Sequence, residues 1–137
     1  MKSTEYEEQL RQLIIQNERV MTILRTVRRC DPPDWLVGAG LIRNLVWDLL
    51  HGYSRPTPPR DIDVAFFDPS DLTPERDTAV TAQLTAVLPN VEWEVTNQAA
   101  VHTWYAESFG KTVPPLTSSA AGIATWPETA TCTVVRL

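Results

Sequence analysis

The stretches Trp35-Leu36-Val37-Gly38-Ala39-Gly40 and Arg60-Asp61-Ile62-Asp63-Val64 decide the fold of this chain. The first predicts a short buried strand that runs directly into a glycine-containing turn, and the residues after it predict a helix over about 41–51. The second opens a strand expected over 62–67. A strand, turn, helix and strand in this order predict an α/β (α+β) domain, in which helices pack on a short mixed sheet.

The turn and the second strand carry the residues suited to chemistry. Gly38 and Gly40 allow backbone amides to approach a phosphate closely, and the helix N-terminus after them adds partial positive charge. Asp61 and Asp63 are two residues apart in a strand, so both carboxylates project from the same face. Two such carboxylates repel each other unless a cation lies between them. Because oxygen ligands suit hard cations, the pattern predicts a site for Mg²⁺ or Mn²⁺.

A third carboxylate is expected to complete this site. Residues 91–95 alternate apolar and acidic side chains and predict a strand on which Glu92 and Glu94 share one face. We favour Glu94, because its neighbours Trp93 and Val95 anchor the strand in the core, and Glu92 remains the alternative.

Arg43 lies in the first turn of the helix that follows the glycines. An arginine there opposes the helix dipole, which favours a role facing a ligand over a purely structural one. We therefore expect Arg43 to reach the phosphates of a triphosphate.

The N-terminal part of the chain predicts a supporting element. Apolar residues recur at steps of three and four over about 4–30, which predicts one helix with an apolar stripe that Asn17 interrupts. The run Asp31-Pro32-Pro33-Asp34 ends it. We divide the chain into an N-terminal helix and linker over 1–34 and a single globular unit over 35–137. The apolar stripe is expected to pack on that unit or to form a homodimer seam.

The remaining elements are expected in the second half of the chain. They are a helix over 74–88, a helix over 99–107, a short helix over 117–125 and a strand over 131–137. Trp47, Trp93 and Trp104 are expected in the core rather than in a platform that stacks on bases.

Composition excludes several classes of protein. The chain has 137 residues, 43% of them hydrophobic, which suits one folded domain. The net charge of −5 argues against a broad polynucleotide-binding face. The N-terminus has no apolar signal region, and no apolar run approaches the ~20 residues that span a bilayer. Cys30 and Cys132 are then expected as free thiols, and the protein is expected in the cytoplasm, without a membrane partner.

These motifs resemble the polymerase-beta-like nucleotidyltransferase superfamily. The head of the tRNA CCA-adding and poly(A) polymerase group is similar to three segments: Gly38–Asn44, Leu49–Gly52 and Arg60–Val64. A family of small bacterial nucleotidyltransferase-like proteins of poorly defined function is more closely similar, over Trp35–Phe67, Glu92–Val95, Asn97–His102 and Trp126–Ala130.

The resemblance implies a metal-dependent transfer of a nucleoside monophosphate from a nucleoside triphosphate to a hydroxyl acceptor. It implies that the metal ligands and catalytic groups are Asp61, Asp63 and Glu94. It implies that the nucleotide is held by Gly38, Gly40, Arg43 and Asn44, the last two standing where the CCA-adding group has Arg-Asp.

The sequence also departs from the pattern of these relatives. Ala39 stands where the CCA-adding group has glycine, and the arginine-rich motif that selects bases in the tRNA enzymes does not follow. Relatives continue past a strand like 131–137, so a missing C-terminal segment is one interpretation. The alternative function is a catalytically inactive member of the fold that binds a nucleotide or a partner. A third interpretation is a regulatory or toxin–antitoxin component, and the identities of the nucleoside triphosphate and of the acceptor stay open.

Overall fold

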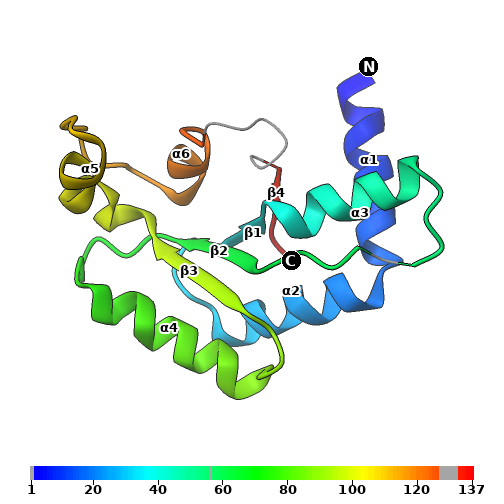
Figure 1. Cartoon of the computed structure of the whole chain (residues 1–137), viewed down its shortest axis with the longest axis horizontal. Helices are drawn as coiled ribbons and strands as arrows, with labels where there is room; N and C mark the ends of the chain where they lie inside the picture. Colours follow the sequence, from blue (N-terminus) through cyan, green and yellow to red (C-terminus); the bar gives the residue numbers. More distant parts are fainter. Residues whose placement is uncertain (1, 56, 127–132) are drawn as a thin grey trace.

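The computed structural model describes residues 2–55, 57–126 and 133–137. Over these residues the chain forms a four-stranded sheet with the strand order β3-β2-β1-β4 (Figure 1). The strands are β1 (Leu36–Gly38), β2 (Ile62–Phe66), β3 (Trp93–Asn97) and β4 (Val134–Val135). β1 runs antiparallel to both β2 and β4, whereas β2 and β3 are parallel, so the sheet is mixed as predicted.

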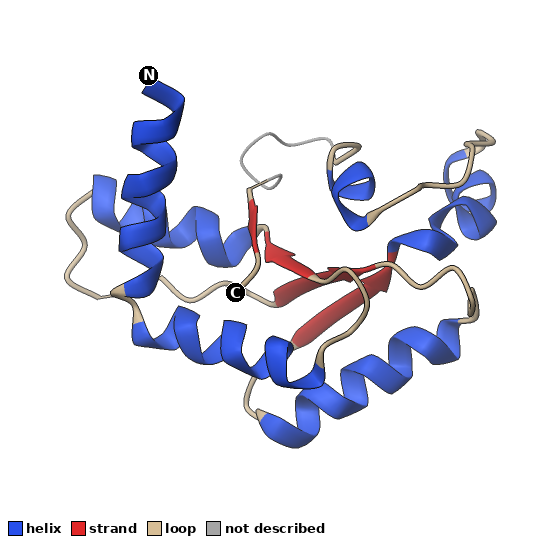
Figure 2. Cartoon of the chain, turned by 180° about the vertical axis from the view of Figure 1, so that it is seen from behind, coloured by secondary structure: helices blue, strands red, loops and turns tan. Residues whose placement is uncertain are grey.

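Helices cover both faces of this sheet. One face carries α2 (Glu18–Cys30) and α4 (Pro74–Val87) (Figure 2). The opposite face carries α3 (Gly40–Leu50), the 3₁₀ turn η1 (Gln98–Ala100), α5 (Val101–Phe109) and α6 (Ser119–Ile123). The first helix, α1 (Lys2–Ile15), extends away from the sheet at one end of the molecule. The predicted mixture of helices around a short sheet is confirmed.

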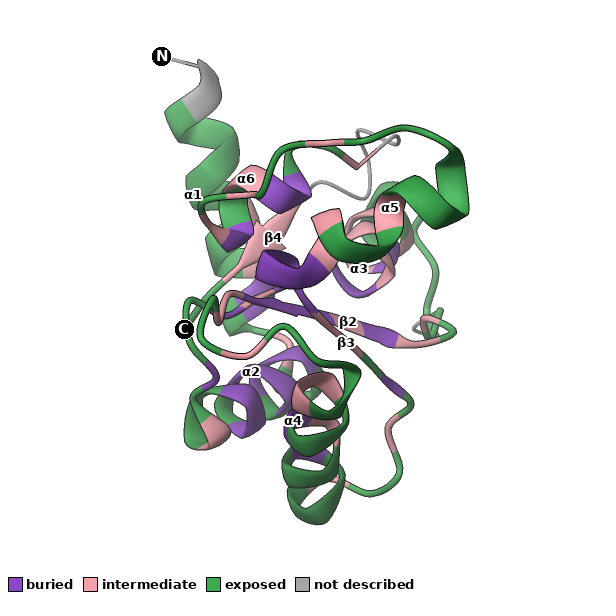
Figure 3. Ribbon diagram, turned by 90° about the vertical axis from the view of Figure 1, so that its left-hand side faces the viewer, coloured by how far each residue is buried: buried purple, intermediate pink, exposed green. Residues whose placement is uncertain are grey.

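Strand β2 divides its side chains between the two faces. Ile62, Val64 and Phe66 are at most 2% exposed and belong to one core cluster with residues of α2 and α4 (Figure 3). The intervening Asp63 lies on the other face, because side chains alternate along a strand. The burial of the apolar residues of β2 therefore fixes the face of the sheet on which Asp63 lies.

The N-terminal segment differs from the single helix predicted over 4–30. The helix breaks at Asn17, whose backbone is extended (φ −99°, ψ 105°) and whose side chain accepts a hydrogen bond from the Val20 amide at 3.0 Å. Asparagine is among the best N-cap residues, so it begins a second helix instead of continuing the first. α2 then packs against α4 and contributes buried residues to the core, whereas most of α1 is exposed. The division of the chain at residue 34 and a homodimer seam on α1 remain predictions.

Other elements lie close to their predicted positions. The third strand begins two residues later than expected, at Trp93, because its pairing with β2 starts there. The last strand is short, and residues 131 and 132 of its predicted range lie outside the described residues. Cys30 carries a free thiol whose pKa is raised by burial, and Cys132 also lies outside the described residues.

The prediction that the tryptophans gather in the core is wrong for two of three. Trp93 is 9% exposed and belongs to the core, but Trp47 is 51% and Trp104 is 42% exposed. Both exposed residues lie on helices of the face opposite α2 and α4. No helix within the described ranges combines the length and the apolar character needed to cross a membrane.

Candidate active site

Three carboxylates meet where β2 and β3 run side by side. Asp61 directly precedes β2, Asp63 lies on β2, and the parallel register places Glu94 of β3 directly opposite Asp63. One oxygen from each carboxylate lies within 4.8 Å of the others. We call this group the carboxylate triad. Glu92 is exposed, precedes β3 and lies outside the group, so of the two predicted alternatives the fold brings Glu94 to the aspartates.

The electrostatics of the triad reflect three acids held close together. The pKa of Asp63 is raised to about 6, first by burial and then by the charge of Asp61. The pKa of Glu94 is raised to about 7, first by its hydrogen bond with Asp61 and then by burial. Arg43 opposes the effect and lowers the pKa of Asp63. The three groups therefore hold their full negative charge only at a cost that a nearby cation would remove.

The geometry of the triad fits a small divalent cation. Oxygen ligands lie about 2.1 Å from Mg²⁺, so neighbouring corners of its octahedron are about 3.0 Å apart and opposite corners about 4.2 Å apart. The three oxygens lie within 4.8 Å of one another, so they would draw closer together around a shared ion. Carboxylate oxygens are also the ligand type that such cations prefer in proteins. The residues present thus suit Mg²⁺ or Mn²⁺.

The turn after β1 lies beside the triad, because Gly38 pairs with Asp63 across the sheet. A Cβ atom at Gly38 would overlap the side chain of Val134 and lie 2.6 Å from the Thr133 carbonyl oxygen. Close packing against β4 therefore requires glycine here. The unusual backbone of this turn belongs to Ala39 (φ 57°, ψ −130°), not to either glycine.

Helix α3 begins at this turn without a side-chain cap. Ala39 occupies the N-cap position and has no side-chain oxygen to accept hydrogen bonds from the first amides of the helix. Gly40 is the first helical residue, and a Cβ atom there would lie 3.3 Å from the Arg43 guanidinium. Uncapped amides at a helix N-terminus are suited to bind an anion.

Arg43 and Asn44 occupy different environments. The Arg43 guanidinium lies 5.3 Å from the centre of the Trp47 ring, and its Nε donates a 3.3 Å hydrogen bond to Asn44. Asn44 is 8% exposed, and its amide donates to the Thr57 carbonyl oxygen at 3.3 Å. Asp48 accepts from the Thr57 amide at 2.6 Å. Asn44 thus holds the chain at Thr57 against α3, while Arg43 lies close enough to Asp63 to lower its pKa.

A cavity of about 620 Å³ adjoins the triad and was not predicted from the sequence. We call it the aromatic cavity, and its lining residues are Ala39, Asp63, Glu94, Thr96, Gln98, Val101, Trp104, Tyr105, Phe109, Thr125 and Trp126. The signal in the sequence is the pair Tyr105 and Phe109, which are four residues apart and therefore neighbours on a helix, with Trp104 next to them. The prediction that placed Trp104 in the core rather than in a stacking platform missed it.

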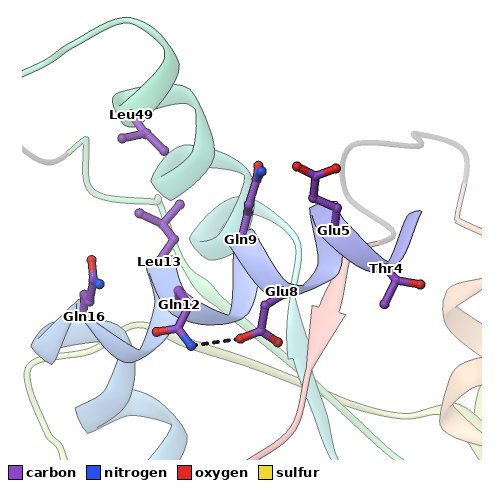
Figure 4. A pocket seen from close by; sticks show the side chains of 8 residues that line it. All are labelled: Thr4, Glu5, Glu8, Gln9, Gln12, Leu13, Gln16 and Leu49. Atoms are coloured by element: carbon purple, nitrogen blue, oxygen red, sulfur yellow. Dashed lines mark hydrogen bonds between the residues drawn. The ribbon is translucent and has the colours of Figure 1, made fainter. Parts of the chain in front are cut away.

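A second hollow, of about 770 Å³, lies between α1 and α3 (Figure 4). Leu13 of α1 and Leu49 of α3 face each other across it, and Glu8 accepts a 2.9 Å hydrogen bond from Gln12 along its rim. Its other lining residues are polar: Thr4, Glu5 and Gln9 of α1, and Gln16 directly after that helix. It contains no member of the triad, so size alone does not identify the site.

Comparison with known proteins agrees with this geometry. A family model described as "Nucleotidyltransferase" matches residues 25–137. A solved structure, described as an NMR structure that reveals a CCA-adding enzyme head domain, superimposes with a TM-score of 0.75 at 28% sequence identity. The match covers 95% of this chain and 65% of the solved chain. No curated protein matches the sequence.

The residues that the family model matches include Trp35–Gly40, Arg60–Val64 and the strand that carries Glu94. The solved head domain shares the arrangement of nearly the whole chain. The family model matches well over half of the residues of this chain. The chain therefore belongs to the nucleotidyltransferase family, within the polymerase-beta-like nucleotidyltransferase superfamily.

Proposed function

We propose that this chain transfers a nucleoside monophosphate from a nucleoside triphosphate to a hydroxyl group, in a reaction that depends on Mg²⁺ or Mn²⁺. The observation that carries the proposal is the convergence of Asp61, Asp63 and Glu94 within 4.8 Å, beside an uncapped helix N-terminus. Family membership implies a nucleoside triphosphate as substrate. The metal requirement, the transfer itself and the residue roles are our proposal.

Each element of the site has a defined task in this reaction. The first amides of α3, at Gly40 and the residues after it, bind the β- and γ-phosphates, with help from the Arg43 guanidinium. Gly38 serves indirectly, because it lets β4 pack closely behind the turn. Asn44 holds the chain at Thr57 and accepts a hydrogen bond from Arg43. Asp61, Asp63 and Glu94 hold the cation, which when bound neutralises the phosphate charge and orients the reacting oxygens.

The bonds balance as in other phosphoryl-group transfers. The acceptor oxygen forms a bond to the α-phosphorus, the bond from that phosphorus to the bridging oxygen of the β-phosphate breaks, and pyrophosphate leaves. The acceptor hydroxyl loses its proton to the Glu94 carboxylate. Glu94 suits this role because it is the exposed member of the triad, so it meets an acceptor that arrives from solvent.

The proposal is tested by thermal melts of the parent protein and of Asp61→Asn and Asp63→Asn. Millimolar Mn²⁺ together with a nucleoside triphosphate should raise the melting temperature of the parent, since a ligand that binds only the native state stabilises it. Each substitution should abolish the metal-dependent part of that rise. Each should leave the metal-free protein as stable or slightly more stable, because one repelling charge is gone.

Glu92→Gln is the matched control, since it removes an exposed acid from the same segment without touching the triad. It should respond to metal and nucleotide as the parent does. Transfer is then measured with a nucleoside triphosphate labelled at the α-phosphate, by following label into an acceptor from a cell lysate. An unchanged metal response in both asparagine variants contradicts the metal site. Nucleotide binding without transfer favours a catalytically inactive, nucleotide-binding member of the family.

A further inference from the structure

The aromatic cavity borders the phosphate turn at Ala39 and extends from there past the triad to the flank of β3. Asp63 of β2 is paired with Gly38 of β1 on one flank and with Glu94 of β3 on the other. Apart from Ala39 and Asp63, the walls of the cavity come from β3, η1, α5 and Thr125–Trp126. The first amides of α3 and Arg43 thus lie at the turn, whereas Glu94 and the aromatic residues of α5 lie in the part of the cavity away from it.

This arrangement gives the two reactants different places, one at the turn and one in the part of the cavity away from it. In the transfer reaction the attacking and leaving oxygens lie roughly in line through the α-phosphorus. If the β- and γ-phosphates lie at the N-terminus of α3, the attacking hydroxyl must approach from the opposite direction. That direction leads from the triad into the aromatic cavity. The compound that carries the hydroxyl therefore occupies the cavity.

The lining of the cavity limits the chemistry of that compound. Tyr105 and Phe109 have ring centres 4.8 Å apart, and the centres of Trp104 and Tyr105 are 6.4 Å apart. Trp104 and Phe109 are 42% and 63% exposed, so a bound compound can reach their side chains. Thr96, Gln98 and Thr125 place polar groups in the same walls. Aromatic faces with a few polar groups are typical of sites for small ring compounds.

The charge of the cavity excludes polyanionic acceptors. Among the described residues that line it there is no lysine, arginine or histidine, while Asp63 and Glu94 supply negative charge. Proteins that stack nucleic-acid bases on aromatic residues combine those residues with a positively charged groove for the backbone. The proposed cation offsets the charge of the carboxylates, but a phosphate group elsewhere in the cavity would find no cationic side chain among the described lining residues. Its volume of about 620 Å³ also suits a small molecule rather than a polymer.

We propose that the aromatic cavity binds the acceptor, and that the acceptor is a small hydroxylated ring compound without phosphate, either neutral or cationic. This inference rests on the proposed function, because it assumes that the triphosphate lies at the turn. It adds the substrate class, which family membership leaves open. Trp104 and Phe109 bind the ring, and Glu94 receives the proton of the hydroxyl.

The test is binding of matched probes to the full chain with Mg²⁺ and a non-transferable α,β-methylene nucleoside triphosphate. The probes are phenyl glucoside, the phenyl glycoside of glucosamine, phenyl glucoside 6-phosphate and a short oligouridylate, each followed by saturation-transfer NMR at millimolar concentration. We expect both unphosphorylated glycosides to bind at least tenfold more tightly than the phosphate or the RNA. Trp104→Ala and Phe109→Ala should each weaken glycoside binding at least fivefold.

Tyr6→Ala is the matched control, because Tyr6 is 64% exposed on α1 and lies outside the cavity. It should leave glycoside binding unchanged. Calorimetry on the same proteins should give equal affinities for the triphosphate analogue, and circular dichroism should show equal folding. These two measurements separate acceptor binding from nucleotide binding and from loss of structure.

Several results would overturn the inference. Tighter binding of the RNA or the 6-phosphate, or no binding of either glycoside, excludes the proposed acceptor class. Weaker triphosphate binding in Trp104→Ala, with glycoside binding unaffected, places the nucleobase in the cavity instead. If the parent protein does not bind the triphosphate analogue with metal, the proposed function fails first. Normal triphosphate binding without discrimination among the probes refutes the inference alone.

Discussion

Ala39 has the most unusual backbone in the site. Its φ of 57° lies where L-residues are rare, and its ψ of −130° takes it out of the left-handed helical region that Asp31 occupies. Such conformations cost about 1–3 kcal/mol and persist where surrounding structure imposes them, often at functional sites. Here the packing of β4 behind Gly38 and the start of α3 impose it. The strained backbone of Ala39 thus sets the direction of the amides next to the triad.

Replacing Ala39 with glycine should release this strain. We expect the free energy of unfolding of Ala39→Gly to be no lower than that of the parent, and up to about 1 kcal/mol higher, because relief of strain offsets the entropy that glycine loses on folding. Ala79→Gly, in the middle of α4 and exposed, should instead lose about 1 kcal/mol. Denaturant unfolding measures both. Equal losses in the two variants would show that Ala39 is not strained.

The raised pKa values of Asp63 and Glu94 predict how stability depends on pH. In the unfolded chain both carboxyls lose their protons near their ordinary values, but in the folded protein their pKa values are about 6 and about 7. Between those limits the folded state holds more protons than the unfolded state, so stability falls as pH rises. The stabilisation that these two carboxyl groups give the folded state is fully present below about pH 4 and is lost above about pH 7.

Melts of the metal-free parent from pH 5 to pH 7.5 should therefore show a falling melting temperature. Asp63→Asn should make the fall smaller, and Glu92→Gln should leave it as in the parent. Saturating Mn²⁺ should reverse the slope of the parent, because cation binding requires ionised carboxylates. A parent curve that rises across this range without metal would contradict the repulsion described for the triad.

At the scale of elements, local sequence patterns predicted the presence and type of strands and helices better than the residues at which they begin and end. The apolar alternation of Ile62, Val64 and Phe66 and the Pro-rich stop after Cys30 set β2 and the end of α2 correctly. The break between α1 and α2 depends on whether Asn17 caps a helix or interrupts one, and periodicity does not distinguish these. The start of β3 depends on pairing with β2, which residues 91–97 alone do not specify.

The two N-terminal helices should contribute unequally to stability. Leu24 of α2 is 2% exposed in the core, so Leu24→Ala should lower the free energy of unfolding by about 2–5 kcal/mol. Leu13 of α1 is only partly buried at the hollow beside α3, and Leu13→Ala should cost clearly less. Denaturant unfolding of both variants tests this, with nucleotide affinity unchanged in each. Equal costs would mean that α1 belongs to the core as fully as α2 does.

For the whole molecule, the sequence predicted the acids of the site but not the space around them. The spacing of Asp61 and Asp63 places both on one face by strand geometry alone. The cavity, in contrast, depends on how α5 and the segment at Thr125–Trp126 lie over the end of β3. That arrangement arises from long-range packing that no local pattern encodes, so Trp104 could not be distinguished from a core residue.

The pairing of Asp63 with Glu94 imposes a rule of parity on the evolution of this chain. Inserting one residue into β3 ahead of Glu94 would turn its carboxylate towards α4 and bring an apolar side chain to the aspartates, whereas two inserted residues would restore the side that it faces. Loop lengths between the strands are free to drift, but insertions within β2 and β3 should be found in even numbers. Metal affinity would then report, in a library of random insertions, which of them preserve the alignment of the two strands.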